Sequence, residues 1–451
     1  MLLCAHYILP VTSDPILDGA ILVRDGQIVE IGQAALLKRI YPDEEVMDFK
    51  ESALMPGMVN LHMHLEDTVM RGIVPDEPYA DWRRSLAITG EKLDARDWRS
   101  SAILGGLEAL TCGITFVADK STTGAAVTAL QKLGMRGIVY REVGAVDKPR
   151  VEYAMRSAHN DILTWAEGAD ESRVSIGIAP RPTYECHPLV FTRAAELARS
   201  ENIPLSVSVA SSSEECDFLA FGGSRLSVEA MREKRGFIEI PPWLPAGVSP
   251  VSYVAEWGGF EADNVLAVHC VHVSKDDVNM LKNQGVSVAV CPRTNAQLSM
   301  GVAPIFDLMR AGLTVGLGTG YSVAIDSTDL ISEMRFGMLL QRAVNPGKFL
   351  DAHTMLRMAT IDAARAVKMD DQIGSLEIGK RADIVAVDLS GSYQSPTDDP
   401  ASAVVNTTSG SDVLMTMIDG KIRYEKGKWH LGADVAKDIA RVIEIRGKLK
   451  K

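Results

Sequence analysis

The chain has 451 residues, of which 46% are hydrophobic and 24% charged, and its formal net charge is −12, a composition typical of a soluble globular protein. The acidic balance disfavours nucleic acids and membrane surfaces as partners, because both attract a basic face. No segment resembles a membrane span or a signal peptide, and the six cysteines form no CxxC pair, so we expect a cytoplasmic protein with reduced thiols.

The first elements along the chain are short β-strands that need a partner. Residues 19–32 alternate apolar and polar side chains around an Asp25-Gly26 turn, which indicates a hairpin. The pattern returns at residues 382–390 and 413–429, with a turn at Asp419-Gly420. Short β units cannot bury an apolar face alone. We therefore predict one composite β-sandwich from residues 1–55 and 370–430, followed by a C-terminal helix at 431–451.

Between these ends, eight short apolar segments alternate with helical stretches. This alternation predicts an α/β fold, a (β/α)8 TIM barrel, over residues 56–369. The longest irregular stretch runs from Ser211 to Pro250, and we expect its Trp243 segment to cover the pocket. The barrel strands are expected at residues 58–65, 113–119, 136–143, 173–180, 204–210, 264–273, 286–292 and 313–319.

Two histidines mark the end of the first expected barrel strand. His62 and His64 are two positions apart, so they lie on the same face of a strand and point into the barrel mouth. Such a pair can hold one metal ion, although two ordinary polar residues at a strand end give the same pattern. Asp119, Lys120 and Cys270 lie near other strand ends, and the sequence assigns them no ligand role.

The wider sequence resembles a known family. The segments that carry the resemblance are MPGMVNLHMHLEDTVMRG, AVHCVHV, CPRTNAQLSMG, GLGTG followed by EMR, and EIGKRADIVAVD. In this order they are similar to the amidohydrolase superfamily, in its cytosine-deaminase-like branch, over nearly the whole chain. Within the branch they look most like aminodeoxyfutalosine deaminases. Adenosylhomocysteine and methylthioadenosine deaminases and triazine chlorohydrolases are more distant relatives.

The resemblance implies a hydrolase that acts on carbon–nitrogen bonds other than peptide bonds. One divalent metal, zinc or iron, would be held by His62, His64, a fifth-strand histidine and an eighth-strand aspartate, and would lower the pKa of a bound water. A glutamate after the fifth-strand histidine and the sixth-strand His269 would move protons. We expect His269 to be this catalytic histidine and His272 to face away from the site.

The chain departs from the family at three of these positions. The family's fifth strand reads approximately HIHLAET, and here Ser208 stands for the metal histidine and Ser211 for the glutamate. The family's eighth strand ends GLGTD, and here Gly320 stands for the metal aspartate. Serine is a poor zinc ligand and glycine has no side chain to offer. The resemblance therefore predicts an incomplete metal site.

Four other residues are candidates for contacts with a substrate. Glu66 matches a deaminase pattern, with a loop salt bridge as the alternative, and Trp82 could stack on a purine-like ring or anchor the packing of its loop. Arg181, in place of a family histidine, could bind a carboxylate or phosphate or form a surface ion pair. Arg293 is either a substrate contact or a structural link between loops, and we interpret Asn295 as a turn residue.

Two functions remain open at this point. In the first, hydrolytic deamination of a purine nucleoside survives in weakened or altered form, through a site remade from His62, His64 and His269. In the second, the chain is catalytically degenerate and binds a small-molecule ligand, or pairs with an active paralogue as a non-catalytic subunit. The missing groups favour the second. A metal-independent reaction has no set of residues to support it. We expect a homo-oligomer, a dimer.

Overall fold

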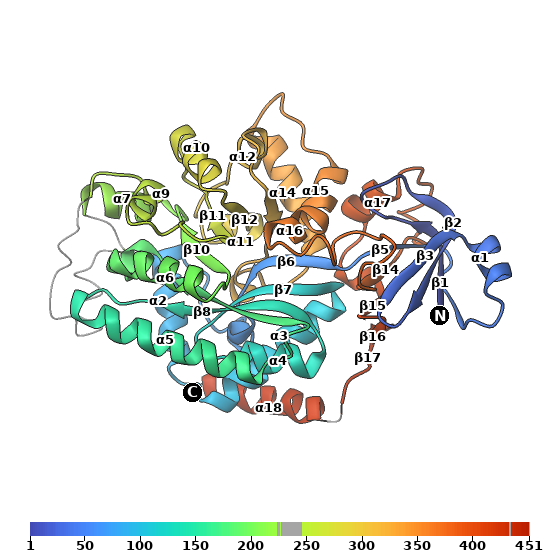
Figure 1. The fold of residues 1–451 in the computed structure, drawn as a ribbon, viewed down its shortest axis with the longest axis horizontal. Helices are drawn as coiled ribbons and strands as arrows, with labels where there is room; N and C mark the ends of the chain where they lie inside the picture. The colour runs from blue at the N-terminus through green and yellow to red at the C-terminus, as the bar shows by residue number, and fades with distance from the viewer. Residues whose placement is uncertain (223–225, 227–245, 433, 451) are drawn as a thin grey trace.

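The computed structural model describes residues 1–222, 226, 246–432 and 434–450, and its centre is a parallel barrel (Figure 1). Eight strands follow one another in the order β13-β12-β11-β10-β9-β8-β7-β6, each parallel to its neighbour. The predicted (β/α)8 architecture is therefore confirmed. The strands are β6 (Met58–Met63), β7 (Ile114–Ser121), β8 (Arg136–Val143), β9 (Val174–Pro180), β10 (Leu205–Val209), β11 (Val265–His269), β12 (Ser287–Val290) and β13 (Val315–Leu317).

The first and last barrel strands meet just beyond β13. Met63 and Gly320 form an isolated parallel bridge, and the Gly320 N–H donates to the His62 carbonyl at 2.8 Å. The barrel interior is filled by one buried apolar cluster, to which alternate strand residues such as Phe116, Ala118 and Val268 contribute. This packed interior leaves the carboxyl-terminal mouth as the place where polar side chains can gather.

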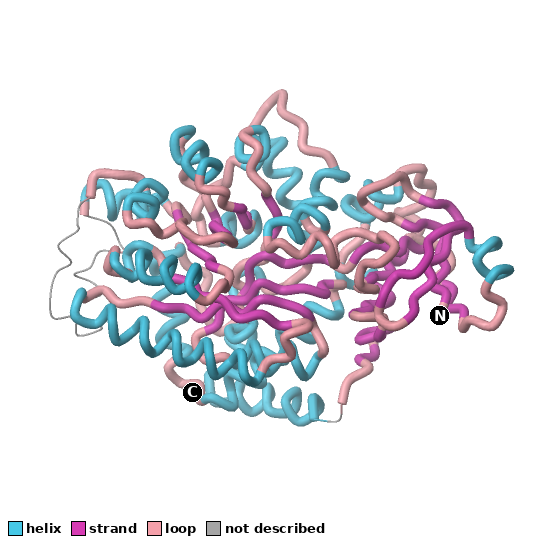
Figure 2. The backbone as a smooth tube through the Cα atoms, viewed as in Figure 1, coloured by secondary structure: helices cyan, strands magenta, loops and turns pink. Residues whose placement is uncertain are grey.

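Helices surround the barrel, as Figure 2 shows with the strands in magenta and the helices in cyan. Two of them, α7 and α9, begin within the stretch from Ser211 to Pro250 that we expected to be irregular. The Trp243 part of that stretch lies outside the described residues. The barrel helices are α2 (Tyr79–Gly90), α3 (Ala95–Thr111), α4 (Ala125–Leu133), α5 (Lys148–Gly168), α6 (Leu189–Ser200), α7 (Ser213–Phe221), α9 (Pro250–Glu256), α10 (Lys275–Asn283), α11 (Pro292–Gln297), α12 (Ile305–Arg310), α13 (Ser322–Ile325), α14 (Leu330–Val344), α15 (Ala352–Met358) and α16 (Ile361–Ala366).

Strands from both ends of the chain form a separate nine-stranded sheet. Its path is β17-β16-β15-β14-β5-β1-β2-β3, with β4 paired to β1, so the two ends meet where β14 pairs antiparallel with β5. This is the composite terminal unit that the sequence predicts. Its elements are β1 (Leu2–Ile8), β2 (Ile16–Arg24), β3 (Gln27–Gln33), α1 (Ala34–Ile40), β4 (Val46–Asp48), β5 (Ser52–Pro56), β14 (Ile384–Asp388), α17 (Pro400–Thr407), β15 (Val413–Ile418), β16 (Lys421–Glu425) and β17 (Lys428–Trp429).

The last helix returns to the barrel. After β17 the chain leaves the terminal sheet, and α18 (Asp434–Leu449) packs on α3, where Arg441 and Lys448 both pair with the buried Asp97 carboxylate at 2.7 Å (Figure 1). Among the described residues, none of the helices has the length and apolarity required to cross a membrane.

Candidate functional site at the barrel mouth

Three histidines meet at the mouth of the barrel. His62 lies near the end of β6, His64 follows that strand, and His269 is the last residue of β11. The ring centroids are 5.0 Å apart for His62 and His64, and 5.4 Å apart for His62 and His269. The structure thus brings together the three histidines that sequence analysis assigned to one site.

Burial keeps these imidazoles neutral. It lowers the pKa of His64 to about 3 and that of His269 to about 4. Burial, together with the charges of His64 and Lys120, also lowers the pKa of His62 well below its usual value. The Nε2 atoms of His62 and His64 are buried and have no hydrogen-bond partner among the described residues. Both nitrogen atoms therefore have an unused capacity for a hydrogen bond or a metal bond.

His269 is held in an uncommon backbone conformation. Its φ is +76° and that of Cys270 is +47°, both in the left-handed region that L-residues seldom adopt. The strand ends here, earlier than the predicted residue 273, and His272 turns away to the Met300 carbonyl at 2.6 Å. Nδ1 of His269 is 2.9 Å from Oδ1 of Asn295. Asn295 thus orients His269, a role that its interpretation as a turn residue missed.

A lysine reaches across the barrel to one of the substituted positions. Lys120 follows Phe116 and Ala118 on the inward face of β7, and its Nζ donates to Ser208 Oγ on β10 at 2.7 Å. Because two strands lie between β7 and β10 in one direction and four in the other, this hydrogen bond spans the mouth. Burial lowers the pKa of Lys120 to about 8, so the ammonium form prevails at neutral pH.

The second substituted position, Ser211, is engaged by a carboxylate from its own helix. Oε2 of Glu215 accepts from both the backbone N–H and Oγ of Ser211 at 2.8 Å, and Oε1 accepts from Thr183 at 2.9 Å. Glu215 is fully buried, and burial raises its pKa. Its carboxyl group therefore ties the end of β10 and α7 to the loop after β9.

The third substituted position has no room for a side chain as it stands. Gly320 has a φ of +69°, and a Cβ atom there would lie 2.6 Å from Thr294 Oγ1. Thr294 Oγ1 is itself held by the Thr319 carbonyl at 2.7 Å. The described residues contain no group of three or more His, Cys, Asp or Glu side chains arranged to hold a metal ion.

Aromatic side chains cover the histidines. Tyr321 stacks on His64 with ring centroids 4.1 Å apart and an interplanar angle of 7°. Trp82, on α2, meets Tyr321 edge-on at 4.9 Å and is 2% exposed. Trp82 is thus separated from His64 by the Tyr321 ring, and its predicted ligand contact stays a prediction. Sequence analysis did not identify Tyr321.

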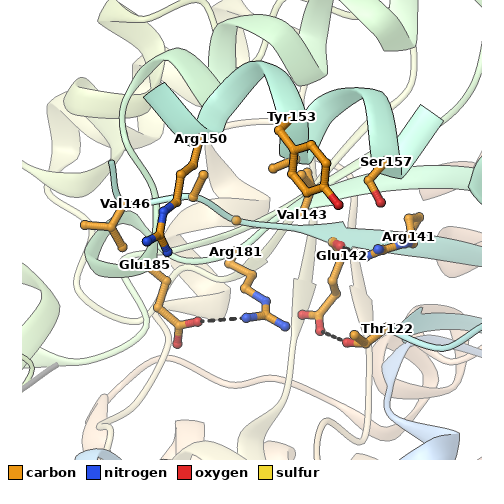
Figure 3. A pocket seen from close by; sticks show the side chains of 13 residues that line it. Thr122, Arg141, Glu142, Val143, Val146, Arg150, Tyr153, Ser157, Arg181 and Glu185 are labelled. Atoms are coloured by element: carbon orange, nitrogen blue, oxygen red, sulfur yellow. Dashed lines mark hydrogen bonds and ion pairs between the residues drawn. The ribbon is translucent and has the colours of Figure 1, made fainter. Parts of the chain in front are cut away.

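Charged side chains form the rim beside this aromatic cover. Arg83 of α2 donates to Tyr321 at 3.1 Å and pairs with Glu185, and Arg181 lies 3.6 Å from the second oxygen of Glu185. Figure 3 shows Arg181 between Glu185 and Glu142, at the edge of a cavity of about 330 Å³. After burial, which raises it, the Arg181 charge has the largest effect on the pKa of Glu142 and helps to lower it to about 2. Arg181 is therefore paired from within the protein.

Glu66 and Arg293 lie beside the mouth but bind other parts of the chain. Glu66 is buried, and its carboxylate accepts from Ser121, from both Thr123 donors and from the N–H groups of Thr122 and Ala125, which open α4. The guanidinium of Arg293 donates to Ser327 Oγ and the Ile325 carbonyl, both at 3.1 Å. These contacts match the structural alternative for Arg293, and the predicted substrate contacts of both residues stay predictions.

Known proteins share this architecture. The family model described as "Amidohydrolase family" matches residues 53–423. A 5-methylthioadenosine/S-adenosylhomocysteine deaminase of Symbiobacterium thermophilum is 30% identical over 93% of this chain and 92% of its own length. An adenosine deaminase from Xanthomonas campestris, solved with bound zinc, has a TM-score of 0.83 at 24% identity and covers 100% of this chain and 98% of its own.

A second solved structure shares the fold. The atrazine chlorohydrolase of Arthrobacter aurescens, solved with zinc, has a TM-score of 0.82 at 23% identity, with 99% of each chain covered. The predicted resemblance to this family and to its deaminases is confirmed by these matches. The finer likeness to aminodeoxyfutalosine deaminases stays a prediction.

Proposed function

The chain belongs to the amidohydrolase family, and from that premise we propose that it binds a small molecule related to purine nucleosides without the family's metal-dependent hydrolysis. The observation that carries this proposal is the hydrogen bond between Lys120 Nζ and Ser208 Oγ, at 2.7 Å. Ser208 stands where the family has a metal-binding histidine. The protein's own ammonium group thus lies against a position from which a metal would be bound, and two cations repel each other at such a distance.

The residues present do not fit the family's metal. Ser208 is a neutral hydroxyl engaged by Lys120, Gly320 has no donor atom, and Ser211 cannot act as a base near neutral pH. Glu215 does not replace the missing base, because hydrogen bonds from Ser211 and Thr183 already occupy both of its carboxylate oxygens. No hydrolytic step that depends on a bound metal can be assigned to this set of side chains.

The ligand class follows from the relatives and from the aromatic cover. The relative from Symbiobacterium thermophilum and the structural neighbour from Xanthomonas campestris are both named for deamination of adenosine-type compounds. In this chain Tyr321 and Trp82 place two aromatic rings above His64, a surface on which a purine could stack after a rearrangement of side chains. A small molecule, rather than a polymer, suits a mouth enclosed in this way.

One observation favours the surviving hydrolase as a second candidate. The unpartnered Nε2 atoms of His62 and His64 are the donor atoms that a zinc ion would use, and His269 adjoins them. A three-histidine site would require Lys120 to leave Ser208 and swing away from the mouth. The two candidates therefore differ in a measurable quantity, the amount of metal per chain.

The test combines metal analysis with ligand binding and ammonia release. Protein purified without chelators and dialysed against zinc is analysed for zinc, titrated with adenosine, inosine and 5′-methylthioadenosine, and assayed for ammonia. The proposal predicts far less than one zinc per chain, no ammonia, and binding of at least one nucleoside. One zinc per chain with ammonia release establishes the hydrolase instead, and the absence of nucleoside binding contradicts the ligand class.

A further inference from the structure

The Lys120 ammonium has hydrogen-bond donors to spare. An ammonium group carries three N–H donors, and Ser208 Oγ is the one acceptor that it contacts among the described residues. No carboxylate lies within 4.0 Å of its Nζ in the described part of the chain. A buried cation in this state needs an acceptor from outside the protein.

The carboxylate with the largest effect on Lys120 is shared with other cations. Glu142 is the strongest acidic influence on the pKa of Lys120. Glu142 accepts from Thr122 Oγ1 at 3.1 Å, and Arg181 acts on its pKa more strongly than Lys120 does. The other carboxylate of the rim, Glu185, pairs with Arg83 and Arg181. Lys120 therefore has no counterion of its own.

The imidazoles extend this donor surface. His62 is 1% exposed, and the Lys120 charge contributes to the lowered pKa values of His62, His64 and His269. A neutral imidazole can carry its proton on Nε2, and those atoms of His62 and His64 are buried without a partner. Nδ2 of Asn295 is a further buried donor without a partner among the described residues.

We propose that this donor cluster, Lys120 with His62, His64 and Asn295, binds an acceptor oxygen of the ligand once the aromatic cover rearranges, so that the chain prefers 6-oxopurine nucleosides to 6-aminopurine nucleosides. The inference rests on the proposed function and specifies its ligand. A 6-oxo group accepts hydrogen bonds from Lys120 and from an imidazole N–H. An exocyclic 6-amino group carries N–H donors, and these would face the N–H donors of Lys120 and of the imidazole. Lys120 would then lack an acceptor, and the ligand would be repelled. An ammonium group in place of a metal would thus change which group at the 6-position of the purine the donor cluster prefers.

The experiment is calorimetric titration of the metal-free chain with inosine and adenosine, which differ at the 6-position. We expect inosine to bind about tenfold more tightly or better, the value of one hydrogen bond to a charged group. Lys120→Met should weaken inosine binding about tenfold and leave adenosine binding within about twofold. Lys282→Met is the matched control, because Lys282 is exposed on α10, and should change neither affinity.

The outcomes separate this inference from the proposed function. Equal or tighter binding of adenosine by the unmodified chain overturns the inference and leaves the proposed function standing. Should neither nucleoside bind, the proposed ligand class fails, and formate then serves as the probe of the donor cluster. Thermal stabilisation by formate that disappears in Lys120→Met supports an acceptor-oxygen site, and the absence of such stabilisation overturns it. The comparison of inosine with adenosine does not depend on whether the variant folds.

Discussion

The barrel mouth has two halves that differ in how their polar atoms are used. On one side, His62 and His64 keep the residue types of the family, and their Nε2 atoms have no partner among the described residues. On the other side, each substituted position has a neighbour fitted to it: Lys120 against Ser208, Glu215 against Ser211 and Thr294 against Gly320. The substituted half is therefore integrated into the protein's own hydrogen bonds and packing, whereas the histidine half keeps two buried imidazole nitrogens without a partner among the described residues.

Each of the three residues that differ from the family pattern contacts a neighbour, so we expect these differences to be coupled to their surroundings. Ser208 accepts a hydrogen bond from Lys120, and Ser211 donates two hydrogen bonds to the buried Glu215 carboxylate. Return of a family residue at one position would displace a neighbour that now depends on the change. We therefore expect substitutions toward the family residues to lower the free energy of unfolding in the substituted half. In the histidine half, we expect the free energy of unfolding to depend on the protonation of the imidazoles.

The largest effect is expected for Ser211→Glu. A second buried carboxyl group would meet Glu215, remove the hydrogen bonds from Ser211 Oγ and overfill the site, at a cost of about 3–5 kcal/mol in the free energy of unfolding. Urea denaturation measures this change. Ser213→Glu, at the exposed start of α7, is the control and should stay within about 0.5 kcal/mol. Addition of Glu215→Gln should recover part of the loss, and a fully stable Ser211→Glu variant would break the comparison.

Gly320→Asp is expected to cost about 2–4 kcal/mol, because a left-handed backbone and a close Thr294 act together. The matched control is Gly285→Asp. Gly285 has a φ of +67° and nothing within 4 Å of its added Cβ, so only the backbone cost of about 1–2 kcal/mol remains. Equal losses for the two variants in thermal or urea unfolding would show that Thr294 yields without cost.

We expect the histidine half to make the free energy of unfolding fall in acid. Burial lowers the folded-state pKa of His64 to about 3 from an ordinary 6.5, so the unfolded chain binds the proton first. The stability that depends on neutral His64 is complete above pH 6.5 and is lost as the pH falls toward 3. Relative to His64→Gln, the unmodified chain should lose about 2 kcal/mol between pH 7.5 and pH 5. Parallel pH profiles of the two proteins, measured by urea denaturation, would contradict this assignment.

The smallest effect is expected for Asn295→Ala. This change removes the acceptor from Nδ1 of His269 and should cost about 1 kcal/mol in the free energy of unfolding. It should also move the imidazole nitrogen signals of His269 in NMR spectra, because the ring loses the contact that orients it. Asn283→Ala, at the exposed end of α10, should change neither quantity. An unchanged His269 spectrum in Asn295→Ala would show that the left-handed backbone alone holds the ring.

The fold was predictable because local patterns of apolar and turn residues indicate its strands. Apolar runs bounded by turns predicted the eight barrel strands, and most observed ends fall within one or two residues of the expected ones. The largest error was at β11, where the apolar run continues to Val273 but the left-handed backbone of His269 and Cys270 ends the strand. Backbone conformation of this kind leaves no signal in an apolar pattern.

The site was predictable only where a motif carried it. The resemblance identified the histidines and the three substitutions, but no spacing rule links Lys120 to Ser208, which lie on strands that are not neighbours. Glu215 and Tyr321 were missed for a related reason, since each acts through a contact set by the folded barrel. A buried lysine that follows apolar residues on an inward strand face is the signal that could have drawn attention to Lys120.

The pairing of β14 with β5 has a consequence for the order of events during protein synthesis. Strand β5 ends at Pro56 and β14 begins at Ile384, so 327 residues separate two strands that must lie side by side. A ribosome adds about 5–20 residues per second, so the edge of β5 waits roughly 15–65 seconds for its partner. During that interval an unpaired strand edge is exposed beside a barrel that is still being made. The nascent chain should therefore depend on holding chaperones until its last quarter has left the exit tunnel.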